Sequence, residues 1–275
     1  MKRNLKDMTV VITGASAGIG EGLARALHAR GARLLLAARR LDRLHALNAE
    51  LGGGHVVIEA DVARREDCDR LIDNAFQSFG RIDTLVLNAG YGVYPRVHET
   101  SPDDVRAIFA TNVFGTTDCI YAATPRMLQQ SPRDGWRGQV MIVSSAAARR
   151  AMPYLGVYSA TKAAQLSVAE AMRVELLPQR LAVTSIHPAM TSTDFGATAE
   201  RGSGIKLPVG DRGKWSQTVE HVVGRMVDAI ETPRPEVWPN RPARWVMPLG
   251  AWLPGTVDRM LEKYRRKVEA ENRAG

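Results

Sequence analysis

Tyr158 and Lys162 lie four residues apart in the segment YSATK, and their residue types suit proton transfer. On a helix, side chains at positions i and i+4 project from the same face. The Lys162 ammonium would then lie beside the Tyr158 phenol and lower the pKa of that phenol from its ordinary value of ~10. A phenol with a pKa nearer to neutrality is an efficient general acid and base. The pair alone is weak evidence, because many helices contain this spacing by chance.

A glycine-rich turn, TGASAGIG at residues 13–20, precedes this pair in the chain. Its three glycines follow a strand-like apolar run and open a helical pattern. Glycines permit a tight turn and the close approach of a pyrophosphate, whose charge the free amides and positive dipole end of the helix would receive. A simple strand-to-helix turn is the alternative, but the flanking elements favour nucleotide binding. The predicted contacts in this turn are Gly14, Ser16, Gly18, Ile19 and Gly20.

The second predicted strand ends with Ala38, Arg39 and Arg40, where sites selective for NAD usually place an acidic residue. No carboxylate stands there, and an arginine can pair with the 2′-phosphate of a ribose through charge-assisted hydrogen bonds. A solvated, basic helix start is the alternative interpretation. The sequence therefore favours NADP(H) over NAD, with Arg39 as the stronger candidate and Arg40 as the weaker one.

Short apolar runs alternate with helical patterns along the chain, which predicts a parallel sheet built from repeated βα units. We therefore expect an α/β fold with a Rossmann-like, doubly wound parallel sheet in a single domain over residues 1–275. The six expected strands are Met8–Thr13, Arg33–Ala38, Val56–Ala60, Thr84–Asn88, Gln139–Ser144 and Ala182–His187. The expected helices lie near residues 19–30, 42–51, 64–79, 103–129, with a kink or end at Pro125, and 157–177.

After His187, the alternation of strand-like and helix-like patterns is no longer evident in the sequence. The glycine-rich stretch 190–216 is expected to form a loop suited to act as a substrate lid. Residues 245–271 form a C-terminal helical extension in which aromatic and aliphatic residues alternate with lysines and arginines. This pattern suits a helix lying at a membrane interface, but it equally describes a helix packed on a neighbouring subunit or on the substrate loop. We favour packing and expect no strong binding to vesicles.

Composition limits the remaining classes of protein. The chain is 45% hydrophobic and 24% charged, which is typical of a soluble globular protein. Its two cysteines, Cys68 and Cys119, have no second thiol or histidine at ligand spacing, so neither a disulfide framework nor a metal site is expected. The first residues lack the apolar core of a signal peptide, which favours a cytoplasmic location. The net charge of +8 is dispersed and accompanies no nucleic-acid-binding module.

Several motifs in chain order resemble those of the short-chain dehydrogenase/reductase family over about residues 8–195. Besides the glycine turn, they are Asp61-Val62, Asn88-Ala89-Gly90, Asn112, Ser144-Ser145, Tyr158 to Lys162, and His187-Pro188-Ala189-Met190-Thr191. The resemblance implies a homo-oligomeric oxidoreductase, a dimer or tetramer, that interconverts a carbonyl and an alcohol with a nicotinamide cofactor. A ketone or aldehyde is the expected substrate.

The resemblance also implies the roles of the catalytic residues. Ser145 would polarise the carbonyl oxygen and Tyr158 would give it a proton as hydride arrives. Lys162 would lower the pKa of Tyr158 and bind the nicotinamide ribose, and Asn112 would hold the helix geometry and a water. Ser145 is preferred to Ser144, because the family places its serine thirteen residues before the tyrosine and Ser144 would point to the opposite side of a strand.

Further cofactor contacts follow from the resemblance. Asp61 would contact the adenine, and Asn88 would close the cofactor cleft. Thr191 and Thr193 lie where the carboxamide and phosphates are held, although residues such as Asn88 and Thr191 could simply cap turns at strand ends. Ala189 departs from the usual Pro-Gly of the family. The remaining predicted contacts are Val62, Ala89, Gly90, Tyr158, Lys162 and Pro188.

Aromatic and apolar residues flank the predicted cleft in sequence and could line an apolar substrate pocket or serve only as packing. These candidates, besides Ser145, are Tyr91, Tyr94, Met152 and Tyr154. Arg149 and Arg150 could meet an anionic part of a substrate or be exposed, and His187 is expected to be a structural histidine. The alternatives to an NADP(H)-dependent reductase are a catalytically silent dinucleotide-binding sensor and a peripheral, membrane-associated lipid or steroid reductase.

Overall fold

The computed structural model describes residues 2–191, 204–205, 207 and 216–273. Its centre is a parallel sheet of seven strands in the order β3-β2-β1-β4-β5-β6-β9. Most of these strands are buried on both faces, which explains why they are short runs of valine, leucine and isoleucine. They are β1 (Thr9–Thr13), β2 (Arg33–Ala38), β3 (Val56–Glu59), β4 (Thr84–Leu87), β5 (Gly138–Val143), β6 (Leu181–Ile186) and β9 (Glu236–Val237).

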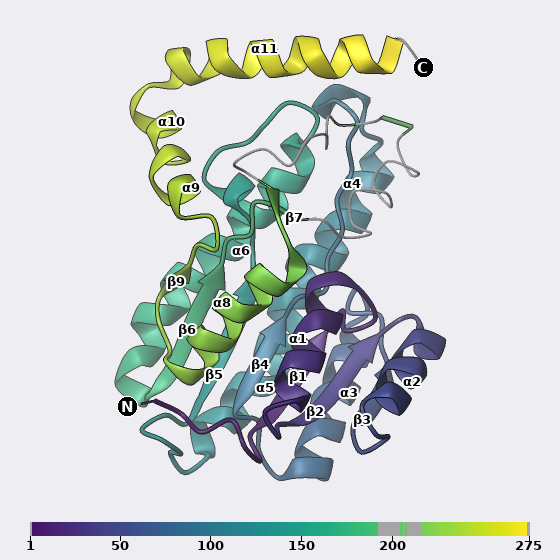
Figure 1. The fold of residues 1–275 in the computed structure, drawn as a ribbon, viewed down its shortest axis with the longest axis vertical. Helices are drawn as coiled ribbons and strands as arrows, with labels where there is room; N and C mark the ends of the chain where they lie inside the picture. The colour runs from purple at the N-terminus through teal and green to yellow at the C-terminus, as the bar shows by residue number, and fades with distance from the viewer. Residues whose placement is uncertain (1, 192–203, 206, 208–215, 274–275) are drawn as a thin grey trace.

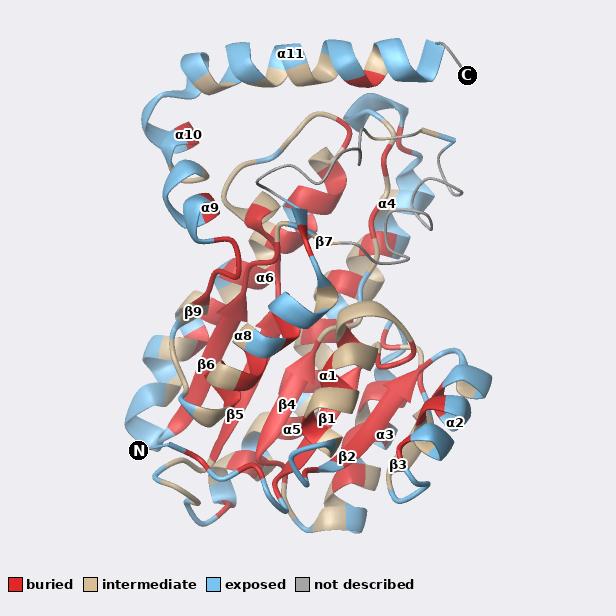
Figure 2. Cartoon of the chain, viewed as in Figure 1, coloured by how far each residue is buried: buried red, intermediate tan, exposed pale blue. Residues whose placement is uncertain are grey.

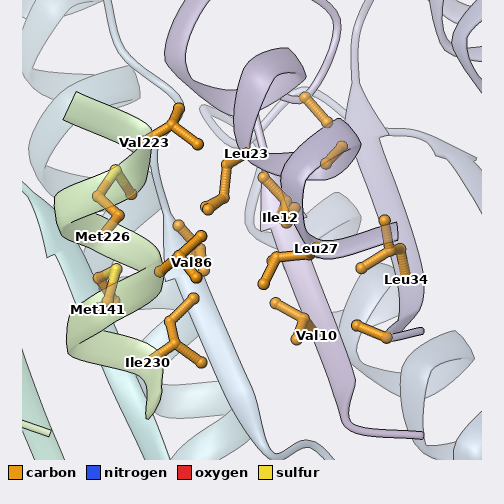
Figure 3. Close-up of a cluster of buried hydrophobic side chains, with 14 of the residues drawn as sticks. Val10, Ile12, Leu23, Leu27, Leu34, Val86, Met141, Val223, Met226 and Ile230 are labelled. Carbon is orange, nitrogen blue, oxygen red and sulfur yellow. The ribbon is translucent and has the colours of Figure 1, made fainter. Parts of the chain in front are cut away.

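Helices cover both faces of the sheet (Figure 1). The helices on one face are α1 (Gly18–His28), α2 (Leu41–Glu50) and α8 (Val219–Glu231), and those on the other are α3 (Arg65–Phe79), α5 (Gly115–Gln129) and α6 (Gly156–Leu176). Figure 3 shows the first core: Leu23 and Leu27 of α1 face Val223, Met226 and Ile230 of α8 above the strands. The predicted α/β fold with a doubly wound parallel sheet in one domain is therefore confirmed.

The predicted secondary structure agrees with the observed elements, with three differences. All six predicted strands are present, each with ends within one residue of the prediction. The stretch expected as one helix over 103–129 is divided into α4 (Pro102–Phe109), a π-helical turn (Ala110–Phe114) and α5. Pro125 lies inside α5 and does not end it.

The other two differences are α8 and β9, which continue the βα rhythm beyond His187. Helix α8 carries apolar residues at the i, i+3/i+4, i+7 spacing that faces a core. Strand β9 has only two residues, Glu236 and Val237, and pairs with β6. Such a short strand lacks the apolar run by which strands are recognised in a sequence.

Short elements complete the chain. Strand β7 (Met190–Thr191) pairs with β8 (Ser216–Gln217). The predicted lid at 190–216 otherwise falls almost entirely outside the described residues. Single 3-10 turns occupy Val97–Glu99, Ala146–Ala148 and Leu177–Gln179.

The C-terminal extension is helical, in the form of α9 (Arg241–Val246), α10 (Leu249–Trp252) and α11 (Pro254–Arg273). Helices α9 and α10 rise from the end of β9 and lead into α11, which crosses the end of the molecule beyond the carboxyl ends of the strands (Figure 1). Most of their surface is exposed (Figure 2). None of the described helices is both long and apolar enough to cross a bilayer.

Candidate active site

The predicted site residues converge at the carboxyl ends of the central strands. The glycine turn follows β1, Asn88 follows β4, and Ser145 follows β5. These three strands are neighbours in the sheet. Ligands of open α/β sheets bind at this edge, where the loops leave the strands. The arrangement brings together a possible phosphate site and the residues suited to proton transfer.

Two positions of the turn sterically require glycine. Gly14 has a φ of +66°, and a Cβ there would lie 2.9 Å from the Ala89 Cα atom. A Cβ on Gly20 would lie 2.5 Å from the Gly14 carbonyl oxygen. Asn88 fixes the turn from the neighbouring strand, because its Nδ2 donates to the carbonyl oxygens of Thr13 at 3.0 Å and Gly14 at 3.2 Å. The backbone of β1 therefore turns tightly into α1 and stays close to the loop after β4.

The start of α1 is suited to a phosphate. Its N-cap is Ala17, which offers no side-chain cap. The first helical hydrogen bond runs from the amide of Glu21 to the carbonyl of Ala17, so the amides before Glu21 have no helical acceptor. Free amides at the positive end of a helix dipole bind anions. The turn thus fits the pyrophosphate of a dinucleotide.

The two arginines after β2 lie at this same turn. Arg40 donates from Nε and Nη2 to Ser16 Oγ at 3.2 and 3.0 Å. Arg39 is exposed and forms no ion pair with the described residues. Asp61 follows β3, where its Oδ1 accepts from the Ala63 amide at 3.1 Å. Two arginines and one carboxylate therefore follow the ends of the neighbouring strands β2 and β3, and Arg40 reaches the glycine turn.

Ser145 and Tyr158 meet as buried side chains joined by a hydrogen bond. Ser145 Oγ also accepts from the Ala147 amide at 3.1 Å, which holds the hydroxyl in place. Tyr158 packs in an apolar cluster with Ile108 and Val157. The prediction that a serine and a tyrosine thirteen residues apart share one site agrees with this geometry.

The electrostatics of Tyr158 differ from the sequence expectation. Burial raises the pKa of Tyr158 to about 12, and the hydrogen bond from Ser145 only partly opposes this. Lys162 does not lower it here, because burial lowers the pKa of Lys162 itself, to about 7, and Nζ lies 5.7 Å from the centre of the Tyr158 ring. The spacing of four residues predicts that the two side chains lie close together. It contains no information about how strongly burial shifts the pKa of each group.

Lys162 is held by partners on two elements. Its Nζ donates to the carbonyl of Val143 at 2.9 Å and to Gln165 Oε1 at 2.9 Å. A Cβ on Gly90 would lie 3.4 Å from this nitrogen, so the loop after β4 passes directly over it. The ammonium nitrogen therefore lies between β5, α6 and the loop after β4.

Gln165 belongs to the candidate site, although no sequence motif indicates it. It is buried, and its Nε2 donates to the Asn112 carbonyl at 2.7 Å and to Thr116 Oγ1 at 2.8 Å. Its side chain thus connects Lys162 to the π-helical turn. The available signal was a glutamine three residues after Lys162, on the helical face that also carries Tyr158.

Asn112 is fully buried in that π-helical turn. Its side chain accepts from the Tyr91 amide at 3.1 Å and donates to the Tyr91 carbonyl at 3.0 Å and to Thr161 Oγ1 at 3.0 Å. Turns of this kind release a backbone carbonyl from the helical ladder, and here Gln165 and Thr116 use that of Asn112. Asn112 therefore ties the loop after β4 to α6.

Ser144 and His187 have structural contacts. Ser144 Oγ donates to the Lys162 carbonyl at 2.8 Å, which fixes α6 against β5. His187 is buried, bonds Ser185 Oγ at 3.0 Å and stacks on Trp238 with ring centres 4.2 Å apart. Burial lowers the pKa of His187 to about 4, so its ring is neutral.

Gln217 holds the loop at residues 188–191, which is predicted to contact the nicotinamide. No sequence motif indicates this second residue. Gln217 Oε1 accepts from the Ala189 amide at 2.9 Å, and Pro188 accepts from the Ala146 amide at 2.9 Å. Thr191 Oγ1 donates to the Ala189 carbonyl at 3.1 Å. Thr193 lies outside the described residues.

Of the candidate substrate residues, Tyr94 and Tyr154 are buried and Tyr91 and Met152 are half-buried. Tyr154 adopts a φ of +65° and its hydroxyl donates to Glu269 of α11 at 3.4 Å. Glu269 also accepts from Arg96 at 2.8 Å. Helix α11 is thereby fastened across the loops that carry Tyr94 and Tyr154.

Arg149 and Arg150 are both engaged within the chain. Arg149 bonds Glu170 at 2.6 Å and Glu236 at 2.8 Å, which links α6 to β9. Arg150 pairs with Asp258 at the start of α11. The guanidinium groups thus connect parts of the fold to one another.

Comparison with known proteins identifies this arrangement. A family model described as short chain dehydrogenase matches residues 8–204. The chain belongs to this short-chain dehydrogenase family. The resemblance seen in the sequence motifs is thereby confirmed, and the protein is an oxidoreductase of the short-chain dehydrogenase type.

Three relatives, one from a plant and two from bacteria, illustrate the similarity. The 11-beta-hydroxysteroid dehydrogenase-like 3 of Arabidopsis thaliana is 37% identical over 199 residues, covering 70% of this chain and 62% of the plant protein. An uncharacterised oxidoreductase of Staphylococcus aureus is 34% identical over 195 residues, covering 70% of this chain and 82% of its own. The uncharacterised oxidoreductase YxnA of Bacillus subtilis is 31% identical over 266 residues, covering 95% and 73%.

Two solved structures share the short-chain dehydrogenase fold. A short-chain dehydrogenase/reductase from Burkholderia phymatum in complex with NAD has a TM-score of 0.80 at 23% identity, covering 92% of this chain and 96% of its own. A 3-ketoacyl-(acyl-carrier-protein) reductase from Brucella melitensis complexed with NADH has a TM-score of 0.71 at 25% identity, covering 83% and 92%. The sheet and its helices are therefore shared with both.

Proposed function

We propose that this chain interconverts a carbonyl and an alcohol with NADP(H), most readily in the direction of reduction, with Tyr158 as proton donor. The observation that carries the proposal is the buried, hydrogen-bonded pair of Ser145 and Tyr158 beside Lys162, at the edge of the sheet where the glycine turn lies. The same edge thus offers a site for a dinucleotide and a site for proton transfer.

A bound nicotinamide would supply the hydride. The residues of the chain supply orientation and the proton. Because one hydrogen bond joins the hydroxyls of Ser145 and Tyr158, a carbonyl oxygen that accepts from one lies within reach of the other. The raised pKa of Tyr158 keeps its phenol protonated at neutral pH, the form required to donate. Ser145 polarises the oxygen while Tyr158 gives it the proton.

The preference for the phosphorylated cofactor rests on Arg39 and Arg40. Both follow β2 directly, and Arg40 donates to Ser16 of the glycine turn. A 2′-phosphate at this corner would receive charge-assisted hydrogen bonds. The two structural relatives contain NAD and NADH, respectively, so the arginines of this chain are the basis for expecting a different preference.

The surroundings of Tyr158 favour an apolar substrate. Partly buried apolar side chains pack around it, including Tyr91, Val93 and Leu155. Helix α11 crosses the loops on this side and would act as a cover. A bulky apolar ketone fits such surroundings, and the plant relative is named for hydroxysteroids.

The test is the oxidation of NADPH at fixed enzyme concentration against a panel of steroid ketones, fatty-acyl ketones, quinones, sugars and aromatic aldehydes. Consumption that depends on an apolar carbonyl, with the alcohol detected as product, supports the proposal. Binding of NADPH without turnover on any class would instead favour a catalytically silent sensor.

A further inference from the structure

The helices α9 and α10 present two opposite stripes. The inward stripe consists of Ala243 and Gly250, both buried. Ala243 packs with Trp238, and Gly250 lies against the side chain of Arg150. The arm formed by residues 241–253 is therefore packed onto the domain along one side.

The outward stripe of this arm is apolar and exposed. Trp245 is 72% exposed, Leu249 47% and Trp252 82%, and they follow one another at i, i+4 and i+7. Of the twelve exposed large hydrophobic residues among the described ones, six lie between residues 245 and 260. The other three of these six are Val246, Leu253 and Met260. This concentration differs from the single exposed apolar side chains that are normal on a protein surface.

The charge around the stripe is positive. Arg241 and Arg244 are exposed beside it, and no acidic residue occurs between residues 239 and 257. Residues 239–273 contain eight basic and four acidic side chains, a net +4 within a chain of +8. The acids lie on α11, where Arg265, Arg266 and Lys267 form ion pairs with glutamates, whereas Arg241 and Arg244 have no acidic neighbour in the arm. Tryptophan places its ring at the level of lipid headgroups, and arginine binds their phosphates.

The sequence favours packing for this segment and predicts no strong binding to vesicles, but packing covers only its inward side and leaves the apolar stripe exposed. We therefore propose that this arm docks on the surface of an anionic bilayer, with Trp245 and Trp252 entering the headgroup region and the arginines binding lipid phosphates. A second copy of the chain is the other possible occupant of an apolar face. It fits less well, because an arginine-flanked stripe without acids would then approach another chain of the same positive charge. A bilayer with negative lipids supplies both the apolar phase and the opposite charge.

The arm is also connected to the entrance of the candidate site. Arg150, on the loop after Ser145, packs on Gly250 and pairs with Asp258. At the other end of α11, Glu269 binds Arg96 and Tyr154. A bilayer touched by the arm would therefore lie on the side of the molecule where α11 crosses the substrate loops.

The experiment is flotation of the full chain with vesicles of phosphatidylcholine alone or with about one third phosphatidylglycerol, at low salt and at about 0.5 M salt. We expect wild type to float with the anionic vesicles at low salt and to be released by salt. The double variant Trp245→Ser/Trp252→Ser is expected to lose at least about tenfold in partitioning. Arg241→Gln/Arg244→Gln is expected to lose its preference for anionic lipid.

The matched control is Tyr121→Ser/Val174→Ser, which removes two exposed apolar side chains from other helices and should float like wild type. Unchanged thermal unfolding and NADPH binding verify that every variant is folded. Absent flotation of wild type, or flotation that the tryptophan variant does not reduce, would overturn the proposal. A tryptophan variant that turns a dimer into a monomer in sedimentation would also overturn it, because a second copy would then be the occupant.

Discussion

The side chain of Gln165 accepts a hydrogen bond from Lys162 Nζ at 2.9 Å and donates one to the carbonyl of Asn112 at 2.7 Å. Lys162 lies on α6, whereas Asn112 lies on the π-helical turn before α5. The Gln165 side chain therefore fixes the position of Lys162 Nζ relative to the π-helical turn. That turn also holds the loop after β4 through Asn112. The effect of Gln165 on the reaction is indirect, through Lys162.

Gln165→Leu should lower kcat by roughly tenfold, equivalent to about 1.4 kcal/mol, because Lys162 loses an acceptor and its nitrogen is less well oriented. Gln165→Glu tests whether Gln165 acts through Lys162, because a purely structural role would leave the pH–rate profile unchanged. A carboxylate in this position raises the pKa of Lys162 from about 7, so the limb of the pH–rate profile assigned to Lys162 should move to higher pH. Gln179→Leu, at an exposed glutamine, is the control. An unshifted profile for Gln165→Glu would remove Gln165 from this role.

Lys162 should also make stability depend on pH in the protein without cofactor. Its pKa is about 7 when folded and 10.5 when unfolded. The unfolded state therefore binds more protons between these values, and stability rises with pH across that window. Lys162→Met should abolish this rise, a difference of roughly 2–3 kcal/mol between about pH 7 and pH 9.5. Denaturant unfolding at several pH values measures it, and parallel curves for both proteins would contradict it.

Gly20→Ala should impair dinucleotide binding and destabilise the fold, because the new Cβ would lie 2.5 Å from the Gly14 carbonyl and 2.6 Å from Asn88 Nδ2. Overpacking of this kind costs about 1–3 kcal/mol. Gly54→Ala is the matched control, since nothing lies within 4 Å of its Cβ position. Thermal unfolding and quenching of tryptophan fluorescence by NADPH report the two effects. Equal behaviour of both variants would show that the turn tolerates a side chain.

The cofactor preference is tested with Ala38→Asp/Arg39→Leu, which replaces a cation by a carboxylate at the end of β2. Loss of a charge-assisted phosphate contact costs about 1.5–3 kcal/mol, so the ratio of kcat/KM for NADPH to that for NADH should fall at least about tenfold. Arg30→Leu, at an exposed arginine on a different loop, should leave the ratio unchanged. Arg40→Leu separates the contribution of the guanidinium bound to Ser16. A wild type that already prefers NADH would refute the NADP(H) proposal.

Much of the fold could be predicted from local sequence. Buried parallel strands require apolar runs, and α1 and α6 are amphipathic or carry distinctive motifs, so these elements were recognised. Strand β9 was not predicted, because two residues are too few to show the alternation of apolar and polar residues that marks a strand. Its pairing with β6 depends on tertiary structure. The π-helical turn at Asn112 was not predicted for a similar reason, because Gln165, which donates to the Asn112 carbonyl, lies 53 residues away in the sequence.

The candidate site was predicted in its residue types but not in its electrostatics. The motif spacing correctly indicated that Ser145, Tyr158 and Lys162 would meet. It could not indicate that burial dominates both pKa shifts, since desolvation depends on how apolar residues from α4 and the neighbouring loops enclose Tyr158. Gln165 was overlooked because its partner Asn112 lies 53 residues away.

The most direct test of the account is the turnover of a responsive carbonyl substrate with NADPH by wild type and Tyr158→Phe. The variant should bind NADPH as wild type does but turn over roughly 10²–10⁴-fold more slowly, because it lacks the proton donor. Tyr121→Phe, at an exposed tyrosine, should retain full turnover. Near-normal turnover by a folded Tyr158→Phe protein would contradict the assignment of Tyr158 as the proton donor.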